Sequence, residues 1–301
     1  MLTIGSRGSQ LALWQAHWIQ ARLEGMGEQC QLQIIHTTGD KITDVALSKV
    51  GTKGLFTKEI EEALLARAID LAVHSLKDMP TELPSGLTLS AIPEREDPRD
   101  ALVGRKLTEL ASGARVGTSS LRRAAQLRAI RPDLEIENIR GNLDTRLRKL
   151  DEGRYDAIVL ASAGLRRLGW DNRIAELLDP QVMCPAVGQG ALAVETRADG
   201  GAAFQISERL EHAGTRIAVT AERAVLASLG GGCQVPIGAH ATVEGNRLHL
   251  RAIVVSPDGS QMIRKEASGP IADAEALGRS VGGELLAEGG RQILEAVYGA
   301  A

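Results

Sequence analysis

The fold class is indicated most clearly by Val116-Gly-Thr-Ser-Ser-Leu-Arg-Arg123, in which a short apolar run ends in small hydroxyl residues and a helix begins. A similar pattern occurs near the N-terminus, where the apolar run 2–5 leads into Gly5-Ser-Arg-Gly-Ser9. Each turn combines the start of a helix with hydroxyl groups and arginine, which favours the binding of an anion. Two such turns facing each other would form a two-lobed binding protein. Strand and helix patterns alternate around both turns, and this alternation predicts an α/β fold with parallel-rich sheets and ligands at the carboxyl ends of strands.

The pattern of apolar residues predicts the individual elements. Strands are expected at residues 2–5, 32–36, 70–75, 134–139 and 157–160 and around Val116, and helices are expected to begin at Ser9, Thr57, Ser119, Asn142 and Ser162. The charged stretch 93–100 contains two prolines and is predicted to be a linker. The last ninety residues or so differ from the rest. A helix near 215–229, strands at 237–243, 248–255 and 261–267, and a helix from about Asp273 predict a small α+β domain with an antiparallel sheet.

Composition excludes several classes of protein. The chain has 301 residues, 44% hydrophobic and 24% charged, which predicts a globular protein of two or three domains. Aromatic residues make up only 2%, too few for stacking on single-stranded nucleic acid, and the net charge is −3. The sequence shows neither a signal-peptide pattern nor an apolar run long enough to span a membrane. We therefore expect a soluble, cytoplasmic protein with no nucleic-acid or membrane partner.

Arginines are concentrated in one part of the chain. Residues 115–173 contain twelve Arg and one Lys against eight acidic residues, a local charge of +5 in a chain that is acidic overall. Several lie at predicted turns or helix starts, where a guanidinium can bind a carboxylate or phosphate through two hydrogen bonds. These residues are Arg122, Arg123, Arg140, Arg146, Arg166 and Arg167. Each of them alone could equally be a solvated helix residue, but the set favours an anionic ligand.

Two further segments could contribute chemistry. His74-Ser-Leu-Lys-Asp78-Met-Pro80 follows a predicted buried strand, so Asp78 could stabilise a cation or transfer a proton; equally, it could cap the next turn. Gly230-Gly-Gly-Cys233-Gln-Val-Pro236 places a cysteine on a glycine-rich loop that can approach a ligand closely, although a lone cysteine is more often a buried apolar residue. The other cysteines, Cys30 and Cys184, form no CxxC pair, and the histidines show no metal-binding spacing. No metal site is predicted.

In their order along the whole chain, these segments resemble the porphobilinogen deaminase family (hydroxymethylbilane synthases) of tetrapyrrole and heme biosynthesis. The resemblance rests on long motifs: Arg7 with Ser9 and 11–16, Lys49-Val-Gly with Lys53-Gly-Leu-Phe56, 72–78, 95–100, 116–123, Arg140-Gly-Asn with Thr145-Arg146, Pro185-Ala-Val-Gly-Gln-Gly190, and 231–237. It implies two lobes like those of periplasmic binding proteins and a third α+β domain. The implied boundaries are 1–94 with 190–208 for lobe 1, 95–189 for lobe 2, and 209–301 for the C-terminal domain.

The resemblance also implies a reaction and a site. The family joins four porphobilinogen units head to tail, with loss of ammonia, to form hydroxymethylbilane, and acts as a monomer. A dipyrromethane cofactor is held by a thioether to the loop cysteine, here Cys233, and primes the chain. Asp78 is the implied catalytic carboxylate. The implied contacts with the acetate and propionate groups of cofactor and substrate are Arg7, Lys77, Arg122, Arg123, Arg140, Arg146 and Arg167. Further implied contacts are Ser9, Asp40, Lys49, Lys53, Thr118, Ser120 and Gln189.

Two alternatives remain from the residues themselves. A non-catalytic two-lobed protein that binds an acidic small molecule would share the arginines but would not need Cys233. A cysteine acyltransferase would use Cys233 but needs a histidine base, which the sequence does not identify. A covalent dipyrromethane on the purified protein would distinguish the deaminase from both.

Overall fold

The computed structural model describes residues 1–41, 55–231 and 235–298. Lys49, Lys53 and Cys233 lie outside the described residues, as does the side chain of Asp40. The chain separates into two compact units. The first contains Met1–Glu96 and Ala191–Arg216, and the second contains Asp97–Gly190 and Ile217–Ala301.

The first unit is built on a five-stranded sheet in the order β2-β1-β3-β10-β4. Its strands are β1 (Leu2–Ser6), β2 (Cys30–Ile34), β3 (Leu71–Ser75), β4 (Leu87–Ala91) and β10 (Leu192–Arg197). Its helices are α1 (Gln10–Glu24), α2 (Thr38–Lys41), α3 (Lys58–Leu65) and α7 (Ala202–Glu208). β1 pairs in parallel with β2 and β3, whereas β10 runs antiparallel to both of its neighbours, β3 and β4.

Helices cover both faces of this sheet, as strand β3 demonstrates. Successive side chains of a strand point to opposite faces. Leu71 and Val73 pack in one apolar cluster with residues of α1, whereas Ala72 packs in another with residues of α3. β3 is therefore buried on both sides, and only its carboxyl end leads to exposed polar residues.

The second unit repeats this arrangement in the order β7-β6-β8-β5-β9. Its strands are β5 (Asp100–Val103), β6 (Arg115–Gly117), β7 (Glu135–Glu137), β8 (Ala157–Ala161) and β9 (Ile174–Leu177). Its helices are α4 (Leu121–Ile130), α5 (Leu143–Asp151) and α6 (Ser162–Arg167). β6 is parallel to β7 and β8, and β5 is antiparallel to β8 and β9. One strand in each sheet runs opposite to the others, β10 in the first sheet and β5 in the second. β5 begins within a few residues of the point where the chain enters the second unit, and β10 begins where the chain returns to the first.

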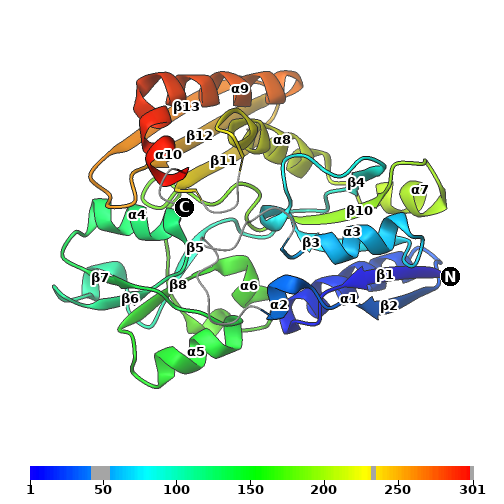
Figure 1. Cartoon of the computed structure of the whole chain (residues 1–301), viewed down its shortest axis with the longest axis horizontal. Coiled ribbons are helices and arrows are strands. Elements are labelled where there is room, and N and C mark those ends of the chain that lie inside the picture. Colours follow the sequence, from blue (N-terminus) through cyan, green and yellow to red (C-terminus); the bar gives the residue numbers. More distant parts are fainter. Residues whose placement is uncertain (42–54, 232–234, 299–301) are drawn as a thin grey trace. The chain divides into compact units, whose positions relative to one another are not determined.

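The C-terminal part contains a three-stranded antiparallel sheet. Its strands are β11 (Ile237–Glu244), β12 (Arg247–Val255) and β13 (Met262–Pro270). Its helices are α8 (Ala213–Ser228), α9 (Ala274–Leu285) and α10 (Arg291–Tyr298), and α8 begins in the first unit. One apolar cluster joins α8, α9 and α10 to this sheet, and Figure 1 shows α9 lying along it.

The predicted fold class, two α/β lobes followed by a small α+β part with an antiparallel sheet, is confirmed. The predicted linker 93–100 is correct except at its last residue, because Asp100 is the buried first residue of β5. The division into three domains stays a prediction, since the chain separates into two units. None of the helices in the described part of the chain is both long and apolar enough to cross a membrane.

Candidate active site

In the first unit, the turn after β1 presents Arg7 and begins α1. Ser9 is the N-cap of α1, and its hydroxyl accepts a hydrogen bond from the Ala12 N–H at 3.3 Å. The Arg7 guanidinium lies over the ring of Phe56, 4.2 Å from the ring centroid, which is a favourable cation–π distance. The Phe56 ring is held in turn by Gly39, because a Cβ at that position would come within 2.3 Å of it. The predicted motifs around Arg7 and Phe56 therefore meet in space.

Asp78 lies at the carboxyl end of the neighbouring strand, β3. The strand runs into a short 3-10 helix, Leu76–Asp78, which presents Lys77 and Asp78. Leu76 and Met79 on either side are almost fully buried, and the Leu76 N–H donates to the Ala191 carbonyl at 3.0 Å. The backbone that carries Asp78 is thus held between two buried residues, and the side chain of Asp78 is exposed.

In the second unit, the turn between β6 and α4 is held by its own hydroxyl groups. Thr118 Oγ1 accepts from the Ser120 N–H at 3.2 Å, and the Ser119 hydroxyl donates to the Ile139 carbonyl. Ser120 is the N-cap of α4, with its hydroxyl 3.5 Å from the Arg123 nitrogen. This turn fixes the first turn of α4, in which Arg122 and Arg123 lie.

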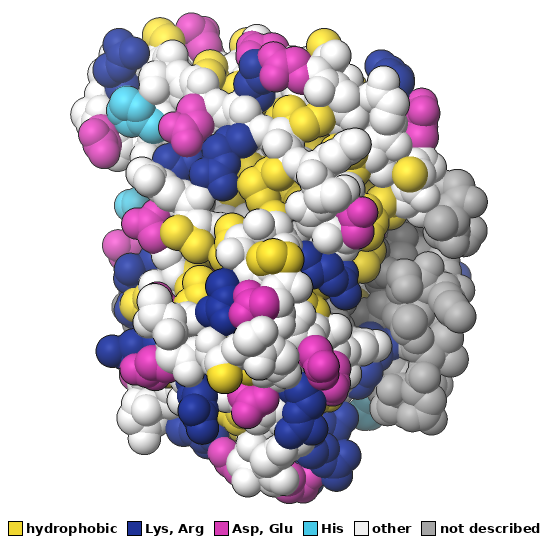
Figure 2. Space-filling view, turned by 90° about the vertical axis from the view of Figure 1, so that its left-hand side faces the viewer, with side chains coloured by type: hydrophobic (Ala, Val, Ile, Leu, Met, Phe, Trp, Pro, Cys, Tyr) yellow, Lys and Arg dark blue, Asp and Glu magenta, His cyan; other side chains and the backbone are white. Residues whose placement is uncertain are grey.

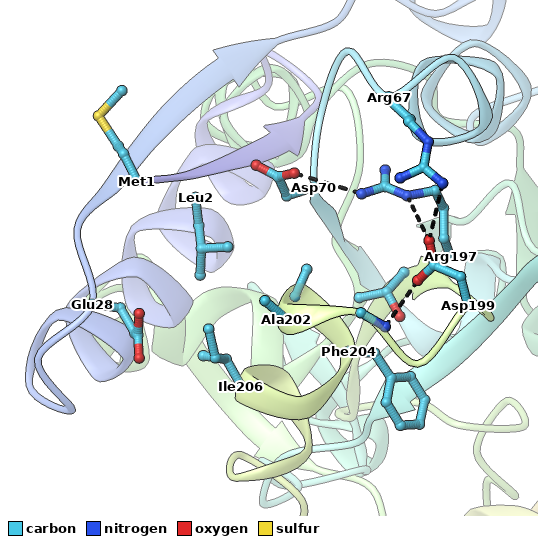
Figure 3. A pocket seen from close by; sticks show the side chains of 13 residues that line it. Met1, Leu2, Glu28, Arg67, Asp70, Arg197, Asp199, Ala202, Phe204 and Ile206 are labelled. Atoms are coloured by element: carbon cyan, nitrogen blue, oxygen red, sulfur yellow. Dashed lines mark hydrogen bonds and ion pairs between the residues drawn. The ribbon is translucent and has the colours of Figure 1, made fainter.

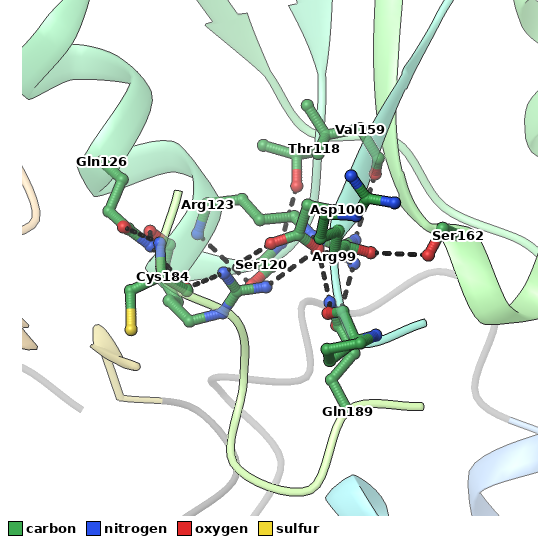
Figure 4. Close-up of polar contacts among 12 residues, drawn as sticks. Arg99, Asp100, Thr118, Ser120, Arg123, Gln126, Val159, Ser162, Cys184 and Gln189 are labelled. Carbon is green, nitrogen blue, oxygen red and sulfur yellow. Dashed lines mark hydrogen bonds and ion pairs between the residues drawn. The ribbon is translucent and has the colours of Figure 1, made fainter. Parts of the chain in front are cut away.

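Both arginines turn inward onto Asp100, which is completely buried, and Figure 4 shows Arg123 beside it. Asp100 accepts hydrogen bonds from Arg122 Nη1 at 2.7 Å and from Arg123 Nε at 2.9 Å. Gln189 donates to the same carboxylate at 2.9 Å. Burial alone would raise the pKa of Asp100, but Arg122 and Arg123 outweigh this effect and hold the pKa well below its usual range. Asp100 is therefore ionised and balances one of the two arginines.

Further arginines extend the positive charge. The pKa of Arg146 is lowered to about 10, first by burial and then by repulsion from Arg123 and Arg140. Arg146 Nε donates to the carbonyl of Gly141, and Arg167 Nη2 donates to the carbonyl of Gly190. Gly141 has φ +110°, and a Cβ there would come within 2.6 Å of Thr145, so this tight turn requires glycine. Mutual repulsion among arginines is relieved by a bound anion, so this arginine cluster (Arg123, Arg140 and Arg146) favours a ligand with carboxylates.

The two described cysteines have buried or partly buried thiols. Cys184 is fully buried, and burial raises its pKa to about 12. Cys30 is half-buried, and burial also raises its pKa. A nucleophilic cysteine needs a lowered pKa and access to solvent, so neither residue has the required environment.

This environment predicts the result of alkylation. Iodoacetamide at pH 8 should leave Cys184 unlabelled in the native protein and label it in guanidinium chloride, because the buried thiol stays protonated until the chain unfolds. Peptide mapping by mass spectrometry measures the labelled fraction. Labelling of native Cys184 as fast as that of a small free thiol would contradict the burial.

A separate cavity of about 410 Å³ lies at the end of the first sheet where β1 and β3 begin (Figure 3). It is lined by Met1 and Leu2 at the start of β1, by Asp70 before β3, and by Arg197 at the end of the reversed strand β10. Arg197 lies between Asp70 and Asp199, at 3.6 and 3.5 Å. None of the predicted site residues that the structure describes lines this cavity, which agrees with the rule that ligands bind at carboxyl ends of strands.

One face of the molecule and the described histidines bear on the other classes of site. On the face drawn in Figure 2, basic side chains lie beside acidic ones, which is unlike a nucleic-acid-binding surface. His74 is buried and pairs with Glu195 at 3.0 Å. Within the described residues there is no group of three or more His, Cys, Asp or Glu side chains that could hold a metal.

Comparison with known proteins points to the same family as the sequence motifs. The family model "Porphobilinogen deaminase, dipyromethane cofactor binding domain" matches residues 2–204, and the model of the C-terminal domain of porphobilinogen deaminase matches 216–287. The chain belongs to the porphobilinogen deaminase family. It is 54% identical to the porphobilinogen deaminase of Syntrophobacter fumaroxidans, over 99% of this chain and 98% of that one. It is 55% identical to that of Trichlorobacter lovleyi, over 99% and 96%.

The cofactor of the porphobilinogen deaminase family fits the residues present in the second unit. A dipyrromethane has an acetate and a propionate on each ring and is therefore strongly anionic. The arginine cluster and the Asp100 network contain more arginines than carboxylates, and Arg123 and Arg140 add to the effect of burial in lowering the pKa of Arg146. The charge of the described cluster is thus complementary to that of the cofactor.

Most site residues implied by the resemblance to porphobilinogen deaminases lie at strand ends. Thr118, Ser120, Arg122, Arg123 and Gln189 belong to one network around Asp100, and Arg7, Lys77 and Asp78 follow β1 and β3. The hydroxyls of Ser9 and Ser120 serve as helix caps. Sequence reasoning missed Asp100, because it ends a charged stretch that is typical of an exposed linker. Its position directly before the apolar run Ala101–Val103 was the available indication.

Proposed function

We propose that Asp78, Cys233 and the arginines carry out the family reaction in this chain. That reaction condenses four porphobilinogen units head to tail, with release of four ammonia molecules, and one water molecule then releases the linear tetrapyrrole as hydroxymethylbilane. The enzyme is a transferase that builds this product on a dipyrromethane primer. The observation that carries the residue assignment is that two buried arginines, Arg122 and Arg123, share the single carboxylate of Asp100, at 2.7 and 2.9 Å.

Arginine suits the substrate because every added pyrrole brings two more carboxylates. A guanidinium binds a carboxylate through two parallel hydrogen bonds and so fixes the orientation of the ring as well as its charge. We assign carboxylate binding of this kind to Arg7, Arg122, Arg123, Arg140, Arg146 and Arg167, and we assign to Lys77 a contact through its ammonium group, which acts as a point charge. Ser9, Asp40, Lys49, Lys53, Thr118, Ser120 and Gln189 are the further proposed contacts. Oriented binding brings the reacting carbons together, which accounts for much of the rate of such condensations.

Asp78 is the proposed catalytic carboxylate. Loss of ammonia from porphobilinogen leaves a positively charged methylene pyrrole, and an aspartate held beside it stabilises that charge. The buried anchors Leu76 and Met79 fix the backbone on both sides of Asp78, which limits the positions that the carboxylate can take. The same carboxylate can accept the proton of a pyrrole N–H.

Cys233 is the proposed attachment point of the dipyrromethane, and the arginines of the second unit are the residues that would hold its carboxylates. When bound, this group supplies the pyrrole to which the first substrate unit is joined. The buried or raised-pKa thiols of Cys30 and Cys184 support the choice of Cys233 among the three cysteines.

The test of the function is the purified protein with porphobilinogen as its only substrate. We expect one ammonia per porphobilinogen consumed and formation of a linear tetrapyrrole, followed by absorbance after cyclisation and oxidation. The alternative, a non-catalytic binder of an acidic small molecule, predicts binding without release of ammonia. Consumption of porphobilinogen no faster than in buffer would contradict the proposal.

Replacement of Arg146 should weaken substrate binding. Arg146→Gln removes one cation from the cluster, and a hydrogen bond to a charged group is worth roughly 1.5–3 kcal/mol, which corresponds to about a tenfold or larger loss of kcat/KM. Steady-state kinetics with porphobilinogen measure this loss.

Arg148→Gln on the same helix is the matched control. Arg148 is 69% exposed and lies 3.8 Å from Glu152, a surface pair that contributes little. The control should stay within about twofold of wild type. Equal losses in both variants would show that Arg146 acts only through the general charge of α5.

We also propose the domain division 1–94 with 190–208, 95–189, and 209–301. Its support is that three separate sheets occur, with β10 returning to the first. A cytoplasmic location and a monomeric state complete the proposal, supported by the free thiols of Cys30 and Cys184 for the location and by the family resemblance for the monomer. Size-exclusion chromatography with light scattering tests the monomer.

A further inference from the structure

The buried carboxylate of Asp100 makes more contacts than a simple ion pair needs. Oδ2 accepts from Arg122 Nη1 at 2.7 Å, and Oδ1 accepts from Arg122 Nη2 at 3.2 Å and from Arg123 Nε at 2.9 Å. Arg123 Nη2 lies 2.8 Å from Oδ1, and Gln189 Nε2 donates to Oδ1 at 2.9 Å. In Figure 4, Arg123 and Gln189 converge on Asp100 from α4 and from the segment before β10.

The charges of this network do not balance. Asp100 is fully buried, and Arg122 and Arg123 are 4% and 6% exposed, so two cations share one anion away from water. Burial of an unbalanced charge is costly unless another group compensates it. If Asp100 served stability alone, one arginine would be sufficient. The second arginine leaves one positive charge for a ligand.

The two arginines differ in the directions of their remaining contacts. Arg122 Nη1 also donates to the Cys184 carbonyl at 2.6 Å, so this guanidinium is held by short bonds to the protein. Arg123 donates to the Val159 carbonyl at 3.0 Å, has a longer contact of 3.4 Å to Gln189, and interacts electrostatically with Arg146 of the arginine cluster. Arg123 is thus the member of the pair that adds its charge to the cluster.

We propose that Asp100, with Arg122 as its counter-ion, is a positioning residue that orients Arg123 toward the carboxylates of cofactor and substrate. Arg122 then holds Asp100 in place in addition to its proposed contact with the ligand. This inference rests on the proposed function, because it presumes that Arg123 binds those carboxylates. It adds a residue that the sequence assigned to a linker.

Asp100→Asn tests the role because the amide keeps the shape but removes the charge. We expect KM for porphobilinogen to rise at least tenfold and the fraction of protein that carries the covalent cofactor, measured by intact mass, to fall by more than half. The matched control is Glu211→Gln. Glu211 belongs to another arginine–carboxylate pair, with Arg216 at 2.6 Å, and also accepts from the Ile92 N–H. The Glu211→Gln variant should have a lower Tm, while its KM and cofactor loading stay near those of the wild type.

KM, cofactor loading and Tm of the two variants together distinguish a positioning role of Asp100 from a purely structural one. A purely structural Asp100 would give the same KM and loading as Glu211→Gln at a similar loss of Tm, and that outcome would overturn the proposal. If Asp100→Asn does not fold, Arg122→Met and Arg123→Met replace it. Arg123→Met should raise KM at least fivefold more than Arg122→Met, and equal or reversed effects would refute the assignment. Wild-type protein measured in parallel separates the two proposals, since an inactive wild type contradicts the function itself.

Discussion

The Cys233→Ser variant should be isolated without a covalent adduct and should lose most of its activity. A thiolate is the side chain best suited to attack the cationic methylene carbon of an activated pyrrole, and a serine hydroxyl stays protonated at neutral pH. Denatured intact-mass spectrometry should show two condensed pyrrole units on the wild-type protein and none on the variant. The bond is a thioether, so thiol reductants should not remove the adduct.

Cys30→Ser is the control for this experiment. Cys30 is half-buried on β2, and its variant should keep both adduct and activity. Peptide mapping of wild-type protein should place the adduct on the peptide that contains Cys233. An active enzyme of unmodified mass, or an adduct on Cys30 or Cys184, would refute the attachment at Cys233.

The Asp78→Asn variant should fold, carry its cofactor and turn over at least about a hundredfold more slowly than wild type. The amide matches the carboxylate in shape but cannot balance a positive charge, and the loss of such a group typically costs a hundredfold or more in kcat. Asp78 is exposed, so the substitution disturbs no buried contact of its side chain. Steady-state consumption of porphobilinogen measures kcat, and thermal unfolding verifies the fold.

Glu82→Gln provides a matched loss of charge four residues further along the same loop. Glu82 is also exposed and should stay near the wild-type rate. If Asp78→Asn retains activity within about threefold of wild type, Asp78 is not the catalytic carboxylate. If both variants are equally slow, the effect comes from the general charge of the loop.

The sequence was sufficient to predict the elements that place the site. Ser9 and Ser120 cap the helices that follow β1 and β6, and the polar run after β3 lies at a strand end, as strand and helix periodicities indicated. These features depend on residues close together in the chain, and such local patterns can be recognised in sequence. The same holds for the three C-terminal strands, which run through 237–270 with short turns.

The sequence could not show the reversed strands β5 and β10. An apolar run such as Ala101–Val103 does not indicate its neighbours, and strand direction depends on pairing with residues far away in the chain. Asp100 was missed for the same reason. Its partners Arg122, Arg123 and Gln189 are 22 to 89 residues away, so the apolar run that follows Asp100 is a local sign of burial but does not identify these partners.

The place of β10 inside the first sheet affects the order in which this protein can fold during synthesis. β10 lies between β3 and β4, so residues 1–96 alone cannot complete their sheet and leave β4 without its only partner. The sheet that contains β5 to β9 is complete by residue 177, before β10 has been translated. We therefore expect the sheet of the second unit to form first on the ribosome. The sheet of the first unit can be completed only after residues 192–197 have been translated.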